Sequence, residues 1–303
     1  MHGVVKEADN EILRDLAHSL LRDAVKDNDP VQVGIALRLG ANVLEPVEFG
    51  TLKTSRGTVT DSATPLIAAV SRKDASAEVV RQLLDAGADA NSSEHGISPP
   101  IHRAAYYNNT EVTKLLAERG ADVNLQDRLG KTSLAWAAQA GSTAAAIILL
   151  EHGADPEIAT NDNEKPLAIA MKNARLDFSE MLLLKGASAN TTDRYGNPVL
   201  HMAIGRNSLR LSSLMVLKGA DVNARDNSGN TPLILAVISG NAAICKKLLD
   251  AGADPMLSDK AGKSASQYAA LSPDPIINVL FRNVTAQKQL GSQGPAAVRR
   301  KIS

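Results

Sequence analysis

The chain has 303 residues, 44% of them hydrophobic, so it can bury a core as one elongated domain or as two compact ones. Lysine plus arginine number 33 and aspartate plus glutamate also number 33, which leaves a formal net charge of zero. Because proteins that coat nucleic-acid phosphates are strongly basic, this balance argues against nucleic acid as a partner.

The cysteine content and the first residues bear on the compartment. A single cysteine cannot form an intramolecular disulfide or a multi-cysteine zinc site, which favours a reducing compartment. The first ten residues include charged side chains, and the longest apolar stretch, residues 144–150, is far shorter than the ~20 residues of a membrane helix. We expect a cytoplasmic protein, or an effector secreted without a Sec-type signal, and no membrane partner.

Residues 1–30 are predicted to form an N-terminal capping helix. Between Glu11 and Lys26, apolar side chains gather on one side of a helix and charged side chains on the other. Such a helix would cover the end of a stack and turn its charged face to solvent. The apolar side chains are those of Ile12, Leu13, Leu16, Leu20, Leu21 and Val25.

Residues 31–270 contain a repeat. The dipeptide Gly-Ala recurs every 33 residues, beginning at Gly87, Gly120, Gly153, Gly186, Gly219 and Gly252. An earlier copy at Gly40 lies 47 residues before Gly87, so an insertion separates the first unit from the second. Copies in one register indicate a repeat array.

We place the insertion at residues 43–63. Its segment 47–60 favours two structures about equally, an elongated β-hairpin finger or a loop without regular structure. In either case the segment is expected to project beyond the neighbouring repeats.

Residues 226–254 illustrate one repeat unit. Thr231 precedes Pro232 at a predicted helix start, where a threonine caps free N–H groups and a proline has none to leave unpaired. Gly252 follows a second helix, where a left-handed residue closes the helix without Cβ strain. Helices this short are marginal alone, so each unit must bury its apolar stripe against its neighbours.

The fifth repeat departs from the pattern. Thr160 and Asn163 replace the usual Asp and Gly of the turn, and Lys165 replaces the capping threonine. Because loss of such a cap costs ~1 kcal/mol, we predict that this repeat is the soft spot of the array.

The C-terminal residues are expected to close the array. Residues 271–283 are predicted to form a capping helix. Residues 284–303 carry four basic residues and no acidic one, which is typical of a disordered basic tail.

The repeat unit resembles the ankyrin repeat, whose pattern combines a 33-residue unit with the motifs T-P-L-H-x-A and G-A-D-x-N. Residues 120–124 and 219–223 both read G-A-D-V-N, and residues 200–203 and 101–104 match the L-H-x-A segment with its histidine. The resemblance implies an all-α solenoid of stacked helix-turn-helix units with β-turn or hairpin fingers. Seven to eight repeats are expected, degenerate caps included.

No catalytic constellation is recognised. Cys245 is predicted to be a buried thiol, and His102 and His201, three repeats apart in the motif's histidine position, are each predicted to brace a turn. Trp136 occupies a position held elsewhere by Ile169 and is predicted to belong to the core. Sequence motifs for nucleotides, zinc proteases and calcium are absent, so we expect no enzyme activity, no cofactor and no metal.

The resemblance implies that partners bind on the concave side, where turn tips and first helices are exposed. The variable positions of that side include three of the four tyrosines, in a chain that is only 3% aromatic. Five basic residues there outnumber Asp162 and Glu164, although these charges could also be ordinary solvated side chains. The predicted protein-binding residues are Tyr106, Tyr107, Arg128, Leu129, Lys131, Lys172, Arg194, Tyr195 and Arg206.

We interpret the chain as a non-catalytic protein–protein interaction module, an adaptor, inhibitor or sequestering subunit that binds a protein with an acidic patch and is monomeric alone. The alternative is a bacterial ankyrin effector delivered to a host, or a toxin-neutralising, immunity-type protein. An enzyme with its site in the insertion is disfavoured, because Glu45, Glu48 and Asp61 have no histidine nearby in sequence.

Overall fold

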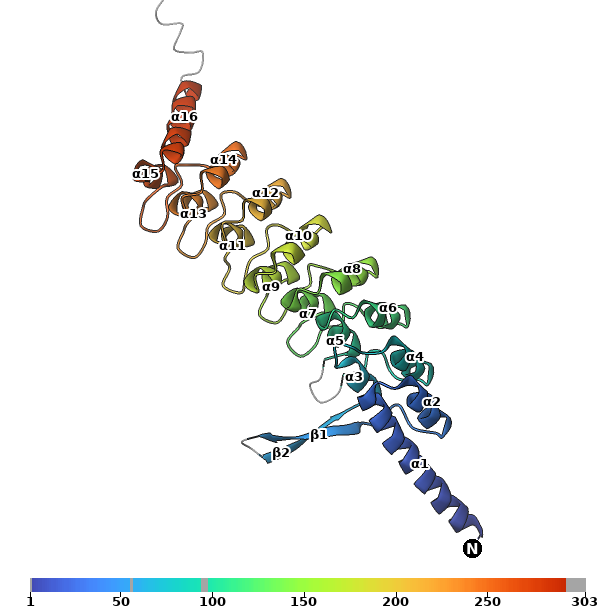
Figure 1. Ribbon diagram of the computed structural model, residues 1–303. Helices are drawn as coiled ribbons and strands as arrows, with labels where there is room; N and C mark the ends of the chain where they lie inside the picture. The colour runs from blue at the N-terminus through green and yellow to red at the C-terminus, as the bar shows by residue number, and fades with distance from the viewer. Residues whose placement is uncertain (1, 55–56, 94–97, 293–303) are drawn as a thin grey trace, which may run out of the picture. The chain divides into compact units, whose positions relative to one another are not determined.

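The computed structural model describes residues 2–54, 57–93 and 98–292, which are mostly helical (Figure 1). The chain divides into two compact units, Met1–Phe178 and Ser179–Ser303, with the boundary inside helix α10 (Leu176–Leu184). None of the helices in the described ranges combines the length and the apolar character needed to span a membrane.

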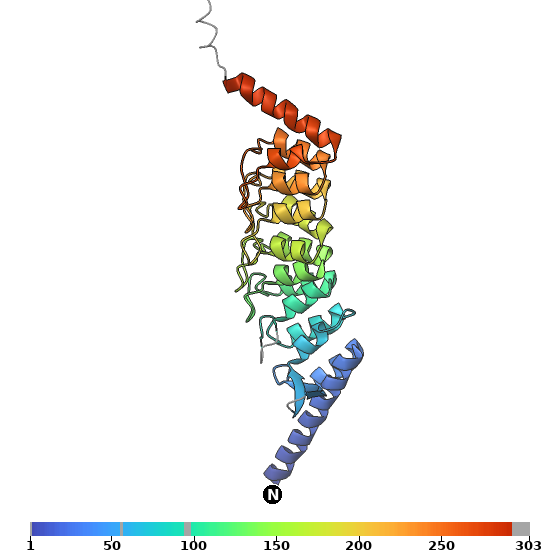
Figure 2. The same ribbon diagram turned by 90° about the vertical axis from the view of Figure 1, so that its left-hand side faces the viewer.

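Unit 1 consists of helix pairs interrupted by one β-hairpin. The first helices of the pairs, α3, α5, α7 and α9, contact one another in succession, while α2, α4, α6 and α8 form a second row (Figures 1 and 2). The elements before α10 are α1 (His2–Asp27), α2 (Pro30–Arg38), β1 (Val47–Thr54), β2 (Gly57–Ala63), α3 (Pro65–Val70), α4 (Ala77–Asp85), α5 (Pro100–Tyr106), α6 (Thr110–Glu118), α7 (Ser133–Ala140), α8 (Thr143–Glu151) and α9 (Pro166–Lys172).

Unit 2 repeats the same plan. Helices α11, α13 and α15 contact one another in order, and so do α12, α14 and α16. The elements are α11 (Val199–Gly205), α12 (Leu209–Leu217), α13 (Pro232–Ile238), α14 (Ala242–Asp250), α15 (Ala265–Ala270) and α16 (Pro275–Ser292). Together the two units confirm the predicted all-α fold of helix-turn-helix repeats.

The residues that delimit the repeat helices act as predicted. The Thr231 hydroxyl accepts a hydrogen bond from the Ile234 N–H at 3.3 Å, and Pro232 lies in the first turn of α13. Gly252 has a φ of +88° after α14. These caps satisfy helix ends that would otherwise leave backbone groups unpaired.

Consecutive repeats are bridged by the asparagine in the last position of the G-A-D-x-N motif, which reads G-A-S-A-N at residues 186–190. In unit 1, the Asn124 amide donates to the Gly153 carbonyl at 3.0 Å and accepts from the Asp155 N–H at 2.8 Å. In unit 2, Asn190 makes the same pair of bonds to Gly219 and Asp221. Each bridge therefore fixes the register of one repeat on the next.

The turns before the first helices form the expected β-turn fingers. In unit 1, the Asp127 carboxylate accepts from the N–H groups of Leu129 and Lys131, both at 2.9 Å. The next finger packs so closely that a Cβ on Gly130 would lie 2.5 Å from Asn161 Oδ1. Neighbouring fingers thus support one another as the helices do.

The fifth repeat keeps its finger by other means. The Thr160 hydroxyl accepts from the Glu164 N–H at 3.2 Å, and Asn163 adopts a φ of +60° in place of glycine. Lys165 makes no side-chain cap bond to α9, as expected. Because α3, α5, α8 and α11 also lack a side-chain cap, the missing cap does not single out this repeat.

The insertion is a two-stranded antiparallel hairpin. Strands β1 and β2 pair from Val47↔Ala63 to Thr54↔Gly57, with an irregularity between Glu48 and Gly50. Val47 and Ala63 are buried where the hairpin joins the repeats. The hairpin alternative is therefore the structure adopted.

The predicted N-terminal helix is present, but only part of its apolar stripe is buried. Helix α1 begins at His2 and buries Leu21 and Val25, but Ile12, Leu13 and Leu16 are exposed. Its neighbours α2 and α3 have nine and six residues, so they cover only the second half of a 26-residue helix.

At the other end, α16 buries Ile277 and Phe281 and continues to Ser292, past the expected boundary at residue 284. Residues 284–292 are rich in helix formers and have no proline, which allows this continuation. The predicted tail from 293 to 303 lies outside the described residues.

His102 braces a finger from inside unit 1. Its Nε2 donates to the Leu125 carbonyl at 2.9 Å, and the ring is 1% exposed. Burial lowers the pKa of His102 to about 4, although the Leu125 carbonyl and the charges of Asp127 and Asp122 oppose this shift. In unit 2, the His201 Nε2 donates to the Asn230 carbonyl at 2.9 Å, which lies within the next finger rather than before it. The predicted bracing role is confirmed for both histidines.

Ala174 adopts a left-handed backbone conformation, with a φ of +56°. The equivalent positions of the other repeats hold asparagine or glycine, namely Asn108, Gly141, Asn207 and Gly240. A left-handed alanine is strained by about 1 kcal/mol, so Ala174→Gly should stabilise the chain by up to that amount despite the entropy of glycine. Urea unfolding measures the change. The control is Ala117→Gly inside α6, which should destabilise; a loss of stability in both variants would contradict the prediction.

The stability of the chain is expected to depend on pH through His102. Unfolded histidine binds a proton near pH 6.5, so the stability that neutral His102 contributes is present above that pH and falls by about 3 kcal/mol as pH drops to about 4. His102→Gln can keep the bond to Leu125 but does not titrate, so its unfolding free energy should fall less between pH 7 and pH 4. Equal slopes in the wild type and in His102→Gln would refute the role of His102.

Candidate functional site

The described part of the chain shows no arrangement suited to metal chemistry, since no group of three or more histidine, cysteine, aspartate or glutamate side chains there could hold an ion. Cys245 is fully buried, and burial raises its pKa to about 12. The thiol is therefore protonated at neutral pH and a poor nucleophile, which confirms the interpretation of Cys245 as a buried thiol.

An aromatic cluster lies on the first-helix side of unit 1. Tyr106, the last residue of α5, packs edge-to-face on Tyr107 with ring centroids 5.4 Å apart and on Trp136 of α7 at 5.8 Å. Tyr106 is 39% exposed. Two of the three predicted tyrosines are thus brought together, and edge-to-face packing adds stability beyond area burial alone.

Trp136 is part of this surface, and its predicted place in the core is wrong. The indole is half-buried, and its Nε1–H donates to Asp127 Oδ2 at 2.8 Å. Ile169 fills the corresponding position and is buried, but an indole is larger and carries a donor that needs a partner. The ring therefore lies at the surface beside the finger.

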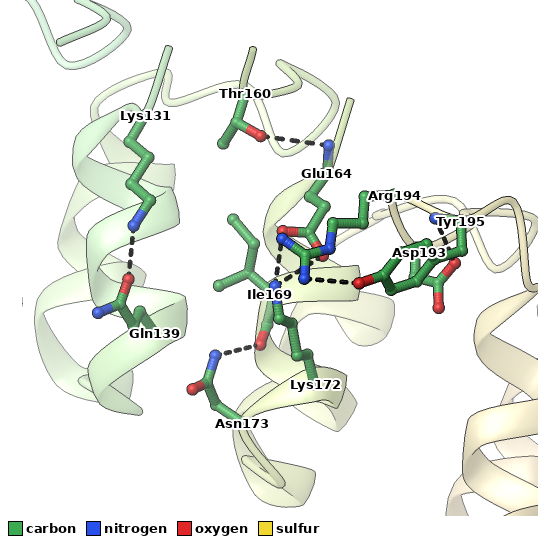
Figure 3. Close-up of polar contacts among 10 residues, drawn as sticks. All are labelled: Lys131, Gln139, Thr160, Glu164, Ile169, Lys172, Asn173, Asp193, Arg194 and Tyr195. Atoms are coloured by element: carbon green, nitrogen blue, oxygen red, sulfur yellow. Dashed lines mark hydrogen bonds and ion pairs between the residues drawn. The ribbon is translucent and has the colours of Figure 1, made fainter. Parts of the chain in front are cut away.

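Lys131 lies over the tryptophan ring. Its Nζ is 4.3 Å from the Trp136 ring centroid. The same Nζ donates to Gln139 Oε1 at 2.6 Å (Figure 3). Arg128 and Leu129 occupy the tip of the same finger and are exposed, Leu129 by 57%. These predicted residues join the aromatic cluster through the turn that Asp127 organises.

Lys172 is already paired within unit 1. Its Nζ contacts both carboxylate oxygens of Glu164, at 3.0 and 3.1 Å. Glu164 is 6% exposed, so the lysine compensates a nearly buried charge. Lys172 is therefore less available to an acidic partner than its position in the sequence indicated.

Unit 2 holds the remaining predicted residues. The Arg194 guanidinium lies over the Tyr195 ring, 4.8 Å from its centroid, and donates to the Tyr195 hydroxyl at 2.7 Å. Tyr195 is 62% exposed. Arg206, the residue after α11, is exposed and donates to the Met202 carbonyl at 3.3 Å. Tyr195 and its arginine form one exposed platform, and Arg206 contacts neither of them by a hydrogen bond.

Sequence reasoning missed two residues of this surface, Trp136 and Arg103. Arg103 of α5 is half-buried, and its Nε is shielded from solvent with no hydrogen-bond partner among the described residues. The sequence did contain a signal for Trp136. It is the single tryptophan of an aromatic-poor chain and lies in the repeat that follows Tyr106 and Tyr107, which favours a contact surface. Arg103 fills the x position of the L-H-x-A segment, where the motif specifies no residue type.

Comparisons with known proteins agree with this architecture. A family model described as ankyrin repeats, in three copies, matches residues 21–127, 101–193, 180–259 and 200–289. Among solved structures, the chain is similar to the ankyrin repeat domain of Bcl-3, described as a unique member of the IkappaB protein family. The identity is 26%, the TM-score is 0.62, and the match covers 72% of this chain and 98% of that chain. No curated protein matches the chain significantly.

Proposed function

We propose that this chain, which belongs to the ankyrin repeat family, is a non-catalytic adaptor, inhibitor or sequestering subunit that binds a protein partner on its first helices and fingers. Ankyrin repeats are in general protein–protein interaction modules. The observation that carries the proposal is the partly exposed cluster of Tyr106, Tyr107 and Trp136, which gathers a large share of the aromatic residues of this chain in one place.

The chemistry of these side chains supports a protein as the ligand. Tyrosine, tryptophan and arginine dominate binding energies at protein interfaces because they combine large area with polar reach. The platform formed by Arg194 and Tyr195 in unit 2 has the same composition. The proposed contact residues are the nine from the sequence together with Trp136.

The partner is proposed to carry an acidic patch. Arg128, Lys131, Arg194 and Arg206 offer cationic groups on the two units, while Lys172 is balanced by Glu164. Acidic groups on the partner would accelerate association and fix its orientation. We also propose that the chain is cytoplasmic, in keeping with its single, buried cysteine. In the absence of its partner, the chain is proposed to be monomeric.

The proposed binding surface can be tested by replacing its tyrosines. Replacing Tyr106, Tyr107 and Tyr195 with alanine should weaken partner binding by about 1 kcal/mol or more for each tyrosine, because truncation removes buried aromatic area at the interface. The partner is first isolated from the native source by affinity purification, and its affinity for both proteins is then measured by calorimetric titration.

Leu217→Ala is the matched control, because Leu217 is 78% exposed but ends a second-row helix. It should bind as the wild type does, and the melting temperatures of all variants are compared to exclude unfolding. Wild-type affinity of the triple variant would remove the proposed surface.

A further inference from the structure

A small pocket opens beside the aromatic cluster of unit 1. Its volume is about 170 Å³. It is lined by Ser98, His102, Arg103, Tyr106, Tyr107 and Trp136. These residues come from α5, the residues flanking it, and α7, so two successive repeats form the pocket.

The walls of the pocket are held in place. Tyr106 packs edge-to-face on both other rings, at interplanar angles of 81° and 84°. The Trp136 indole is fixed by its bond to Asp127, and His102 by its bond to the Leu125 carbonyl. A ligand entering the pocket therefore meets aromatic surfaces that lose little conformational freedom on binding.

The volume of the pocket limits the occupant to a single side chain. Pockets for drug-sized molecules occupy about 300–1,000 Å³, whereas an engineered apolar cavity of about 150 Å³ in another protein accommodates benzene. A leucine side chain is of this size class and would bury its branched end against three rings.

The charges around the pocket favour an anion beside that side chain. Arg103 lines the pocket, and its Nε is shielded from solvent without a hydrogen-bond partner in the described part of the chain. Lys131 stands over the Trp136 ring. An arginine donor without a partner is costly when desolvated, and a carboxylate is the group that a guanidinium binds best.

Among the described residues, Asp127 is the carboxylate that hydrogen-bonds to pocket residues, and it does not offset this preference. Asp127 accepts hydrogen bonds from Trp136 and from the Ser98 hydroxyl, the latter at 3.2 Å, and from two backbone N–H groups of its own finger. His102 is buried and neutral at pH 7, so it adds no charge of its own. An incoming cation would meet two positive side chains and a carboxylate whose oxygens are occupied.

We infer that this pocket binds the leucine side chain of an acidic segment in the protein partner, with a neighbouring carboxylate of that segment paired to Arg103. The inference rests on the proposed function and specifies the partner sequence that one repeat pair recognises. Burying the leucine supplies affinity, and the paired carboxylate selects acidic sequences over basic ones.

Trp136 is the only tryptophan of the chain, so its fluorescence reports on the pocket directly. The full chain is titrated with the acetylated and amidated peptide Asp-Glu-Leu-Glu-Asp. The control peptides are Asp-Glu-Gly-Glu-Asp, which lacks the apolar side chain, and Lys-Lys-Leu-Lys-Lys, which reverses the charge. We expect a saturable change in emission with the first peptide and at least about tenfold weaker binding of each control.

Two variants locate the binding. Arg103→Met should weaken binding of the acidic leucine peptide about tenfold through loss of the charge pair, while Arg210→Met, on helix α12 of unit 2, should leave the affinity within about twofold. The wild-type comparison of three peptides stands even if Arg103→Met folds poorly. Equal binding of all three peptides, or no saturable change up to about 5 mM, would overturn the inference.

The outcome is distinguishable from failure of the proposed function. If the peptides fail but the tyrosine variant still loses its natural partner, the pocket inference falls and the protein-binding surface remains. If the natural partner binds the tyrosine variant with wild-type affinity, the proposed protein-binding surface is refuted together with the pocket inference.

Discussion

The structure depends on contact between successive repeats. Helices α2 to α15 have only six to nine residues each, a length at which a helix is marginal in water. Each pair gains stability by burying apolar side chains against the next pair, such as Val112 and Leu116 of α6, which are fully buried. Asparagine bridges such as that of Asn124 add a directional element, because both amide atoms bond to the backbone of the following repeat. Apolar burial thus supplies the stability, and the bridges set the register.

The same contacts build the candidate binding surface. Asp127 closes its own finger through two backbone N–H groups and also orients the Trp136 indole. His102 ties α5 to the chain leading into that finger. The side chains that face a partner are therefore positioned by groups that serve the fold, which is how short and exposed elements can hold a rigid aromatic cluster.

The sequence predicted most of the repeat architecture, because period, caps and turn residues are local signals. Such signals correctly predicted the threonine cap of α13, the left-handed Gly252 and the bracing histidines. The prediction that Trp136 belongs to the core was wrong, because the burial of a side chain at this position depends on the space between the neighbouring repeats. The exposed apolar residues of α1 were missed for the same reason, since periodicity does not say how far a partner helix extends. The strain at Ala174 and the unpaired Nε of Arg103 arise from backbone angles and packing that only the folded chain defines.

The central claim, that each repeat is held by its neighbour, can be tested by native-state hydrogen exchange on the full chain carrying Asn124→Ala. The substitution removes both bonds to the following repeat, so we expect faster exchange in α6 and also in α8, whose hairpin loses the bridge. Asn173→Ala, which removes a 2.8 Å bond to the Ile169 carbonyl of its own repeat, serves as the control and should change exchange only around α9. Faster exchange confined to residues 121–127, with α8 protected as in the wild type, would contradict the claim.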